Sequence, residues 1–268
     1  MEKIKDRVAR LAMSVSLIAW LFQGCSSALR FDPTPEGEFQ AAYHQYENGK
    51  FTKAIEQFKQ VIYKYPGSDL VEQSRYYLAD SYFQNKDFLL ASNEFEQLTR
   101  EFPQGRFADV SLFKAGLSYA EMSRRPERDQ QETRKALETL QTLLAKYPNT
   151  EYADTTRKHI ARLKDKLAAK EMLTVRFYYD RRLYDSAIIY LKGILSSYPE
   201  SSEMPSALYH LYYASLKMGY PDDAEDARKW LCRDYPDSQY GRELCGSKPA
   251  DDTLTGSPGD STGGKKNE

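Results

Sequence analysis

The sequence is poor in the residues that metal and redox chemistry requires. Its 268 residues include three cysteines, three histidines and six methionines, which leaves little material for such a centre. Lysine and arginine (38) nearly balance aspartate and glutamate (39), which argues against a general nucleic-acid binder. Charged residues make up 29% and the mean hydropathy is −0.71, which excludes a polytopic membrane protein.

Motifs that would indicate catalysis are also missing. There is no Cys-x-x-Cys pair, and His44, His159 and His210 fall on separate helical segments without an acidic or cysteine partner at ligand spacing. We therefore expect no enzyme activity, no metal and no cofactor. Tyrosine, in contrast, occurs 21 times. Composition alone thus favours a protein that interacts with other proteins, because interfaces are enriched in tyrosine.

Residues 1–24 are typical of a secretory signal peptide. The first ten residues hold four basic side chains, and residues 11–22 are apolar apart from two serines, about half the length that spans a bilayer. The small residue Gly24 precedes Cys25, which resembles a bacterial lipobox, where cleavage leaves an N-terminal cysteine that carries lipid. An ordinary signal peptide with a chance cysteine is the alternative. The resemblance implies a lipidated Cys25, a linker over 25–36 and a place on the periplasmic side of the outer membrane.

An internal repeat sets the predicted architecture. An aromatic residue followed by proline recurs five times, and the prolines are 37, 45, 51 and 37 residues apart. Twelve residues before each proline stands an alanine, which is a regularity that composition cannot produce by chance. The pairs are Tyr65-Pro66, Phe102-Pro103, Tyr147-Pro148, Tyr198-Pro199 and Tyr235-Pro236, and the alanines are Ala54, Ala91, Ala136, Ala187 and Ala224.

The spacing within each repeat predicts a helix hairpin. Offsets of −12, −8, −5 and −1 from the proline form one apolar stripe of an α-helix, and the proline ends that helix. A second apolar-periodic segment precedes each alanine after a short turn. Five such hairpins resemble the tetratricopeptide repeat, which implies an all-α right-handed solenoid. The expected pairs are 37–48 with 51–64, 72–84 with 88–101, 109–122 with 133–146, 170–181 with 184–197, and 206–218 with 221–234.

The repeats divide the chain into three parts after the linker. The repeat domain covers 37–246, with three repeats in 37–150 and two in 151–246, and residues 151–183 read as one long amphipathic helix. Residues 123–130 form an insert in the third hairpin. Residues 247–268 contain one large apolar residue, Leu254, and are expected to be a disordered tail.

Aromatic residues recur on the predicted inner face of the first helices. Tyrosines on a concave surface suit an extended peptide, because they offer a large area and hydroxyls for backbone groups. The alternative is that these side chains pack between helices as core. The candidate binding residues are Phe39, Tyr43, Tyr46, Tyr76, Asp80, Phe83 and Phe113.

Three stretches of the sequence, together with the lipobox and the five repeats, resemble one family, the outer-membrane assembly lipoproteins called BamD or YfiO. The resemblance covers about residues 20–245, and its most specific stretches lie within 43–54, 146–153 and 177–187. It implies that the first three repeats receive unfolded outer-membrane proteins through their C-terminal aromatic signal. It also implies that the last two dock on the periplasmic domains of the barrel subunit BamA, beside the other lipoproteins of the β-barrel assembly machine.

A cell-envelope scaffold of the Tol–Pal type, similar to CpoB, is the alternative family. Its repeats are similar, but that family is normally not lipidated and carries a coiled coil ahead of the repeats. In this sequence no heptads precede residue 37, and Cys25 argues for a lipid.

Cys232 and Cys245 are expected to form a disulfide. With Cys25 acylated they are the only other thiols, and the compartment is oxidising. A chain that reverses at Pro236 and Asp237 brings the two positions together, and residues 238–245 can form a short capping helix. The alternative is that Cys232 is a small buried hydrophobe and Cys245 is free.

Overall fold

Helices account for about three quarters of residues 33–246, the part of the chain that the computed structural model describes. The signal peptide, Cys25, most of the linker and the tail 247–268 lie outside it. Within this part there is no strand, and none of its helices combines the length and the apolar character that a membrane span requires. The helices are α2 (Pro35–Glu47), α3 (Phe51–Lys64), α4 (Val71–Gln84), α5 (Phe88–Glu101), α6 (Ala108–Met122), α7 (Gln131–Lys146), α8 (Ala153–Asp180), α9 (Tyr184–Ser197), α10 (Met204–Met218), α11 (Pro221–Asp234) and α12 (Gln239–Gly246).

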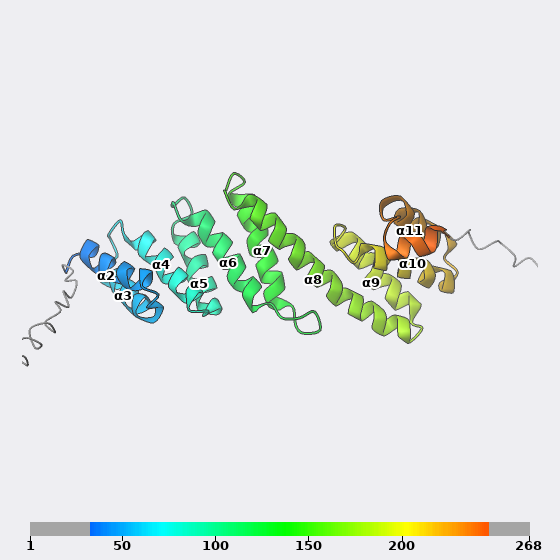
Figure 1. Cartoon of the computed structure of the whole chain (residues 1–268), viewed down its shortest axis with the longest axis horizontal. Coiled ribbons are helices and arrows are strands. Elements are labelled where there is room, and N and C mark those ends of the chain that lie inside the picture. The colour runs from blue at the N-terminus through cyan, green and yellow to red at the C-terminus, as the bar shows by residue number, and fades with distance from the viewer. Residues whose placement is uncertain (1–32, 247–268) are drawn as a thin grey trace, which may run out of the picture.

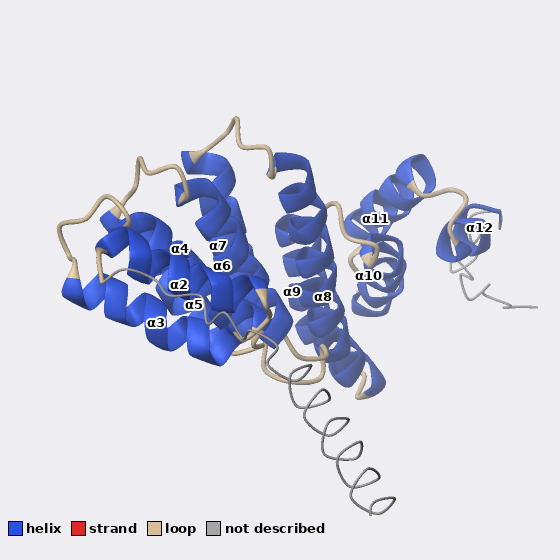
Figure 2. Cartoon of the chain, turned by 60° about the vertical axis from the view of Figure 1, so that its left-hand side comes forward, coloured by secondary structure: helices blue, strands red, loops and turns tan. Residues whose placement is uncertain are grey.

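The helices follow one another along an elongated row, with α2 and α11 at opposite ends (Figure 1). Each helix packs against the next one in the chain from α2 to α12, and short loops join them at the edges of the row (Figure 2). The predicted all-α solenoid of five helix hairpins is therefore confirmed. The predicted bounds agree within two residues, except that the long helix begins at Ala153 and ends at Asp180 rather than spanning 151–183.

The aromatic-proline pairs end the second helix of each hairpin, as their chemistry requires. Proline disfavours the helical conformation of the residue before it. The aromatic residue accordingly leaves the helix in all five hairpins, with φ from −126° at Tyr65 to −134° at Tyr235. The first helices end differently. In α10, for example, Gly219 takes a left-handed conformation with φ of +73°, which glycine adopts without the strain of a Cβ.

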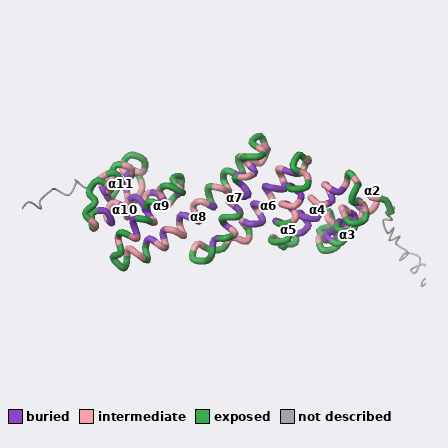
Figure 3. The backbone as a smooth tube through the Cα atoms, turned by 180° about the vertical axis from the view of Figure 1, so that it is seen from behind, coloured by how far each residue is buried: buried purple, intermediate pink, exposed green. Residues whose placement is uncertain are grey.

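The core runs along the seams between neighbouring helices rather than collecting at one centre (Figure 3). The repeated alanines sit at these seams; Ala54, Ala91, Ala136 and Ala187 have no exposed surface. Gly116 plays the same part in α6, because a Cβ built there would lie 2.5 Å from Cδ2 of Leu140 on α7. The small residues thus set how closely the helices approach.

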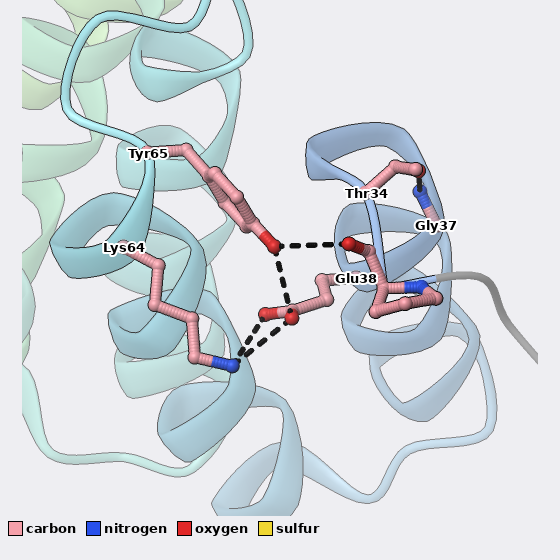
Figure 4. Close-up of polar contacts among 6 residues, drawn as sticks. Thr34, Gly37, Glu38, Lys64 and Tyr65 are labelled. Carbon is pink, nitrogen blue, oxygen red and sulfur yellow. Dashed lines mark hydrogen bonds and ion pairs between the residues drawn. The ribbon is translucent and has the colours of Figure 1, made fainter.

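A polar clamp fastens the start of the first hairpin. Thr34 caps α2 by accepting a hydrogen bond from the Gly37 amide at 3.0 Å. Glu38, one turn into α2, accepts hydrogen bonds from Lys64 Nζ at 3.0 Å and from the Tyr65 hydroxyl at 3.1 Å (Figure 4). The C-terminal end of α3 therefore holds the N-terminal end of α2, where the chain enters the solenoid.

The long helix α8 connects two separate apolar cores. Leu163, in its first half, packs with α6 and α7, whereas Met172 and Val175, in its second half, pack with α9 and α10. The insert 123–130 lies against the middle of this helix, where Lys166 Nζ donates to the Ser123 hydroxyl at 2.8 Å. The insert therefore supports α8 where it passes from the first three repeats to the last two.

The short helix α12 closes the C-terminal end of the row. It packs on α10 and α11, with Leu244 buried, and a disulfide joins Cys245 to Cys232 of α11 with their Cα atoms 5.7 Å apart. Gly241 permits this packing, because a Cβ there would lie 2.1 Å from the backbone oxygen of Tyr235. The structure therefore places the disulfide where it fixes a helix that has few other buried side chains.

We predict that removing this disulfide with Cys232→Ser and Cys245→Ser lowers the free energy of unfolding of the last repeat by up to about 3 kcal/mol. A loop of this length loses about that much entropy in the unfolded chain when it is closed. Urea unfolding followed by fluorescence measures the change. Intact-mass measurement of unreduced protein after alkylation is the control, and two alkylated thiols in the native protein would rule the bridge out.

Candidate peptide-binding site

A buried carboxylate connects the first helices of the first three hairpins. Asp80 of α4 is only 2% exposed. It accepts a hydrogen bond from the hydroxyl of Tyr46 on α2 and forms an ion pair with Nζ of Lys114 on α6, at 2.5 Å. A buried charge is tolerated when it is paired and hydrogen-bonded, and Asp80 meets both conditions. The network therefore fixes three successive first helices relative to one another.

Aromatic rings surround this network. Lys114 Nζ lies 5.4 Å from the centre of the Tyr76 ring and 6.0 Å from that of Phe83, at distances where a cation is attracted to a ring face. Tyr76 also stacks on Phe107 with 4.5 Å between the ring centres. These partly buried rings form a surface beside the neutralised ion pair. The surface lies on the side of the molecule where the first helices of the hairpins are.

The phenol groups of this surface keep their protons well into the alkaline range. Burial, followed by the hydrogen bond to Asp80, raises the pKa of Tyr46 far above its ordinary value. Burial likewise raises the pKa of Tyr43 to about 12 and, together with the charge of Asp80, raises that of Tyr76. At physiological pH these hydroxyls are therefore neutral, and that of Tyr46 already donates its proton to Asp80.

Tyr77 is the residue that the sequence reasoning missed. Its ring lies 4.9 Å from that of Tyr43 and 5.2 Å from that of Tyr46, so it joins the aromatic residues of α2 to those of α4. Tyr76 and Tyr77 are adjacent in the sequence, and only Tyr76 was assigned to the inner face. We call the half-buried set Tyr43, Tyr46, Tyr76, Tyr77 and Phe83 the aromatic face.

Two of the candidate binding residues belong to the core. Phe39 is 4% exposed and packs against Phe58, whereas Phe113 is 9% exposed and stacks on Tyr152 at 4.9 Å. Their burial leaves them little surface for a ligand, so we do not include them in the aromatic face. Both side chains are large enough to fill the space next to the small residues at the helix crossings. Asp80 is buried as well, and it contributes to this surface through Tyr46 and Lys114.

A second exposed surface lies at the turns of the last two hairpins. Leu183 and Tyr220 occupy equivalent positions before α9 and α11, and the Tyr220 hydroxyl donates to Asp185 at 3.2 Å, which places the two turns side by side. Leu183 is 50% exposed, and so is Phe177 of α8, over whose ring the Arg181 guanidinium lies at 3.7 Å. We call Phe177, Leu183, Leu216 and Tyr220 the turn patch.

The described residues contain no group of three or more His, Cys, Asp or Glu side chains that could hold a metal ion. What they offer is a series of helix hairpins with an aromatic face and an apolar patch at the turns. This arrangement defines a tetratricopeptide-type repeat scaffold.

The chain belongs to the YfiO family of outer membrane lipoproteins, which matches residues 32–231. It is 24% identical to the outer membrane protein assembly factor BamD of Caulobacter vibrioides, over 86% of this chain and 77% of that one. It is 26% identical to BamD of Vibrio cholerae, over 79% of this chain and 92% of that one. Among solved structures, a thermophilic TPR protein of Thermus thermophilus is 17% identical with a TM-score of 0.36, over 78% of this chain and 96% of that one.

We predict that Lys114→Met lowers the free energy of unfolding by about 3 kcal/mol, because it leaves the buried Asp80 carboxylate without its cation. The double variant Asp80→Asn with Lys114→Met should lose less than the single Lys114 variant, because the charge that needs compensation is gone. Urea unfolding of wild type, both single variants and the double variant measures the coupling. Strictly additive losses would contradict a shared buried network.

Proposed function

We propose that this protein is a periplasm-facing, lipid-anchored scaffold of the β-barrel assembly machine. It binds unfolded outer-membrane proteins and the barrel subunit BamA, and so promotes folding and insertion of the clients. Membership of the YfiO family and the assembly factors among its relatives support this role. The observation that carries it is the aromatic face, because it supplies ring surface and protonated hydroxyls without a reactive centre.

The aromatic face fits an extended client segment that ends in an aromatic residue. Rings such as Tyr43 and Phe83 offer apolar area whose conformational freedom is already restricted by packing, so little entropy is lost on binding. The hydroxyls other than that of Tyr46, which already donates to Asp80, can donate to backbone carbonyls, which a client presents whatever its sequence. Lys114 lies among the rings with about a fifth of its side chain exposed, and its charge is balanced by Asp80.

The turn patch fits the docking of BamA. Exposed apolar residues in one place on a polar protein mark interaction surfaces, and the two basic residues Arg181 and Arg182 border this patch. The aromatic face belongs to the first three repeats and the turn patch to the last two. A client and BamA would therefore occupy different parts of the same scaffold.

We predict that photo-crosslinkers at Tyr43 and Phe83 capture a peptide that ends in an aromatic residue. Both positions belong to the aromatic face, and neither removes the hydrogen bond of Tyr46 to Asp80. Crosslinkers at Lys59 and Glu96, on the second helices α3 and α5, serve as controls. Gel analysis of purified full-length protein measures capture, and equal yields at both sets would contradict a binding role for the aromatic face.

We predict that Leu183→Glu with Leu216→Glu reduces the BamA that co-purifies from detergent-solubilised membranes by about tenfold, the effect of losing about 1.4 kcal/mol of binding free energy. Leu89→Glu with Leu90→Glu is the matched control, because these leucines are equally exposed beside the turn of the second hairpin. Quantitative immunoblotting measures recovery. Recovery of Tol or Pal components in place of BamA would favour the alternative cell-envelope scaffold.

A further inference from the structure

A groove of about 660 Å³ opens on the second helices, away from the aromatic face. The helices α5 and α7 form its two walls, and α6 forms its floor. Leu112 and the ring of Tyr119 supply that floor, and both are almost fully buried. The walls carry Asn93, Glu96 and Arg100 on α5, and Lys135, Glu138, Thr142 and Lys146 on α7.

Each helix contributes one straight row of side chains to this groove. The wall residues on α5 and on α7 are spaced three or four apart, so each set lies on one face of its helix. The α7 row extends from Lys135 to Lys146, which is about 16 Å along the helix axis. The two walls are parallel helices. The length of their rows of side chains equals about three turns of an additional helix placed between them.

The equivalent groove one repeat earlier is smaller, about 360 Å³, and the chain itself bridges it. There Arg75 of α4 reaches across to α5 and forms ion pairs with Glu94 at 3.7 Å and with Glu101 at 2.7 Å. These three residues tie the floor helix to the wall helix. A lysine lies over the aromatic floor residue in both grooves, Lys59 over Tyr82 at 5.3 Å and Lys135 over Tyr119 at 5.4 Å.

The α5–α7 groove lacks this ion-paired bridge because all three charged residues are replaced. A shift of 37 residues between the floor helices brings Arg75 to Leu112, and a shift of 45 between the wall helices brings Glu94 to Thr139 and Glu101 to Lys146. The apolar Leu112 thus stands at the position of the ion-paired Arg75, and the cation Lys146 stands at the position of the carboxylate Glu101.

Two lysines of the α5–α7 groove, Lys135 and Lys146, form no ion pair with a described residue and can therefore pair with a partner protein. Lys146 forms no ion pair with any described residue, and the contact found for Lys135 is with the Tyr119 ring, at 5.4 Å. Glu96, in contrast, is already engaged by the Tyr119 hydroxyl at 3.0 Å and by Arg100 at 3.6 Å. The α7 wall therefore presents Lys135 and Lys146, with the exposed Glu138 between them, over a floor of Leu112 and Tyr119.

We propose that this groove binds an amphipathic α-helix of a partner protein whose apolar stripe rests on Leu112 and Tyr119. Carboxylates on one flank of that helix pair with Lys135 and Lys146, about three turns apart, and supply the negative charges that Glu94 and Glu101 provide in the preceding repeat. The parallel walls favour a helix over an extended chain, because side chains at helical spacing interdigitate with the rows on both walls. This interface is separate from the aromatic face and goes beyond the proposed function.

The test places photo-crosslinkers at Asn93 and Thr142 of the full-length chain in cells, one on each wall of the groove. Mass spectrometry then maps the captured segment. We expect both positions to capture the same segment, with apolar residues at helical spacing and acidic residues on one flank. Crosslinkers at Lys59 and Tyr63, in the smaller groove between α3 and α5 that Arg75 bridges, should capture it weakly or not at all.

A charge reversal decides whether the lysines hold the partner. Lys135→Glu with Lys146→Glu should reduce capture at Asn93 by about tenfold or more, as expected when two close charge pairs become repulsive. Lys53→Glu with Lys59→Glu, on exposed positions of α3, is the matched control and should change nothing. Thermal unfolding by circular dichroism confirms that both double variants fold.

Several results would overturn the proposal. Capture of lipid, of an extended client segment, of a second copy of this chain or of nothing at all would each do so. Undiminished capture by the Lys135 and Lys146 variant would also reject it, because the carboxylate pairing would then be absent.

Discussion

Every hairpin in this solenoid depends on a small residue at the point where two helices cross, because a larger side chain there would push the helices apart. Alanine fills that position in each second helix, and Gly116 shows how little room remains, because one added Cβ would collide with Leu140. Overpacking of a filled core costs about 1–3 kcal/mol. In a repeat protein each unit contacts only its neighbours, so displacement at one crossing shifts the next repeat along the row. The distances within the Asp80 network and between the walls of the groove follow from this contact.

The binding surfaces arise where the repeats stop being alike. Identical hairpins would bury identical residues and present one uniform surface along the row. Here Asp80 binds Tyr46 and Lys114 beneath aromatic rings in the first three repeats, whereas in the last two the exposed Leu183 and Tyr220 lie at neighbouring turns. Three replaced charges, Arg75 by Leu112, Glu94 by Thr139 and Glu101 by Lys146, distinguish the bridged groove from the larger one in the next repeat. The residues that recur in every repeat thus define the scaffold, and the residues that differ between repeats form the candidate contact surfaces.

The sequence predicts the helices well because local rules decide them. An apolar stripe of period 3.6 and a proline after each second helix leave little freedom in where these helices end. Which side of a helix an aromatic ring occupies depends on how the helices pack against one another, and local sequence rules do not determine it. Phe39 and Phe113 were placed on the binding surface, yet both fill the core, and Tyr77 was overlooked although it touches the rings of α2. The α5–α7 groove was missed too, and comparison of charges at equivalent repeat positions was the signal that could have revealed it.

The unbroken helix α8 has a consequence for how the two halves of the molecule face each other. It takes part in both cores, packing through Leu163 on one side of its midpoint and through Met172 and Val175 on the other. In an α-helix each residue adds about 100° of rotation and 1.5 Å of rise. The orientation of the last two repeats relative to the first three is therefore encoded in the number of residues in α8. Insertion or deletion of one residue near the middle of α8 would rotate the turn patch by more than a quarter of a circle about the helix axis. The side chains of both halves would stay the same.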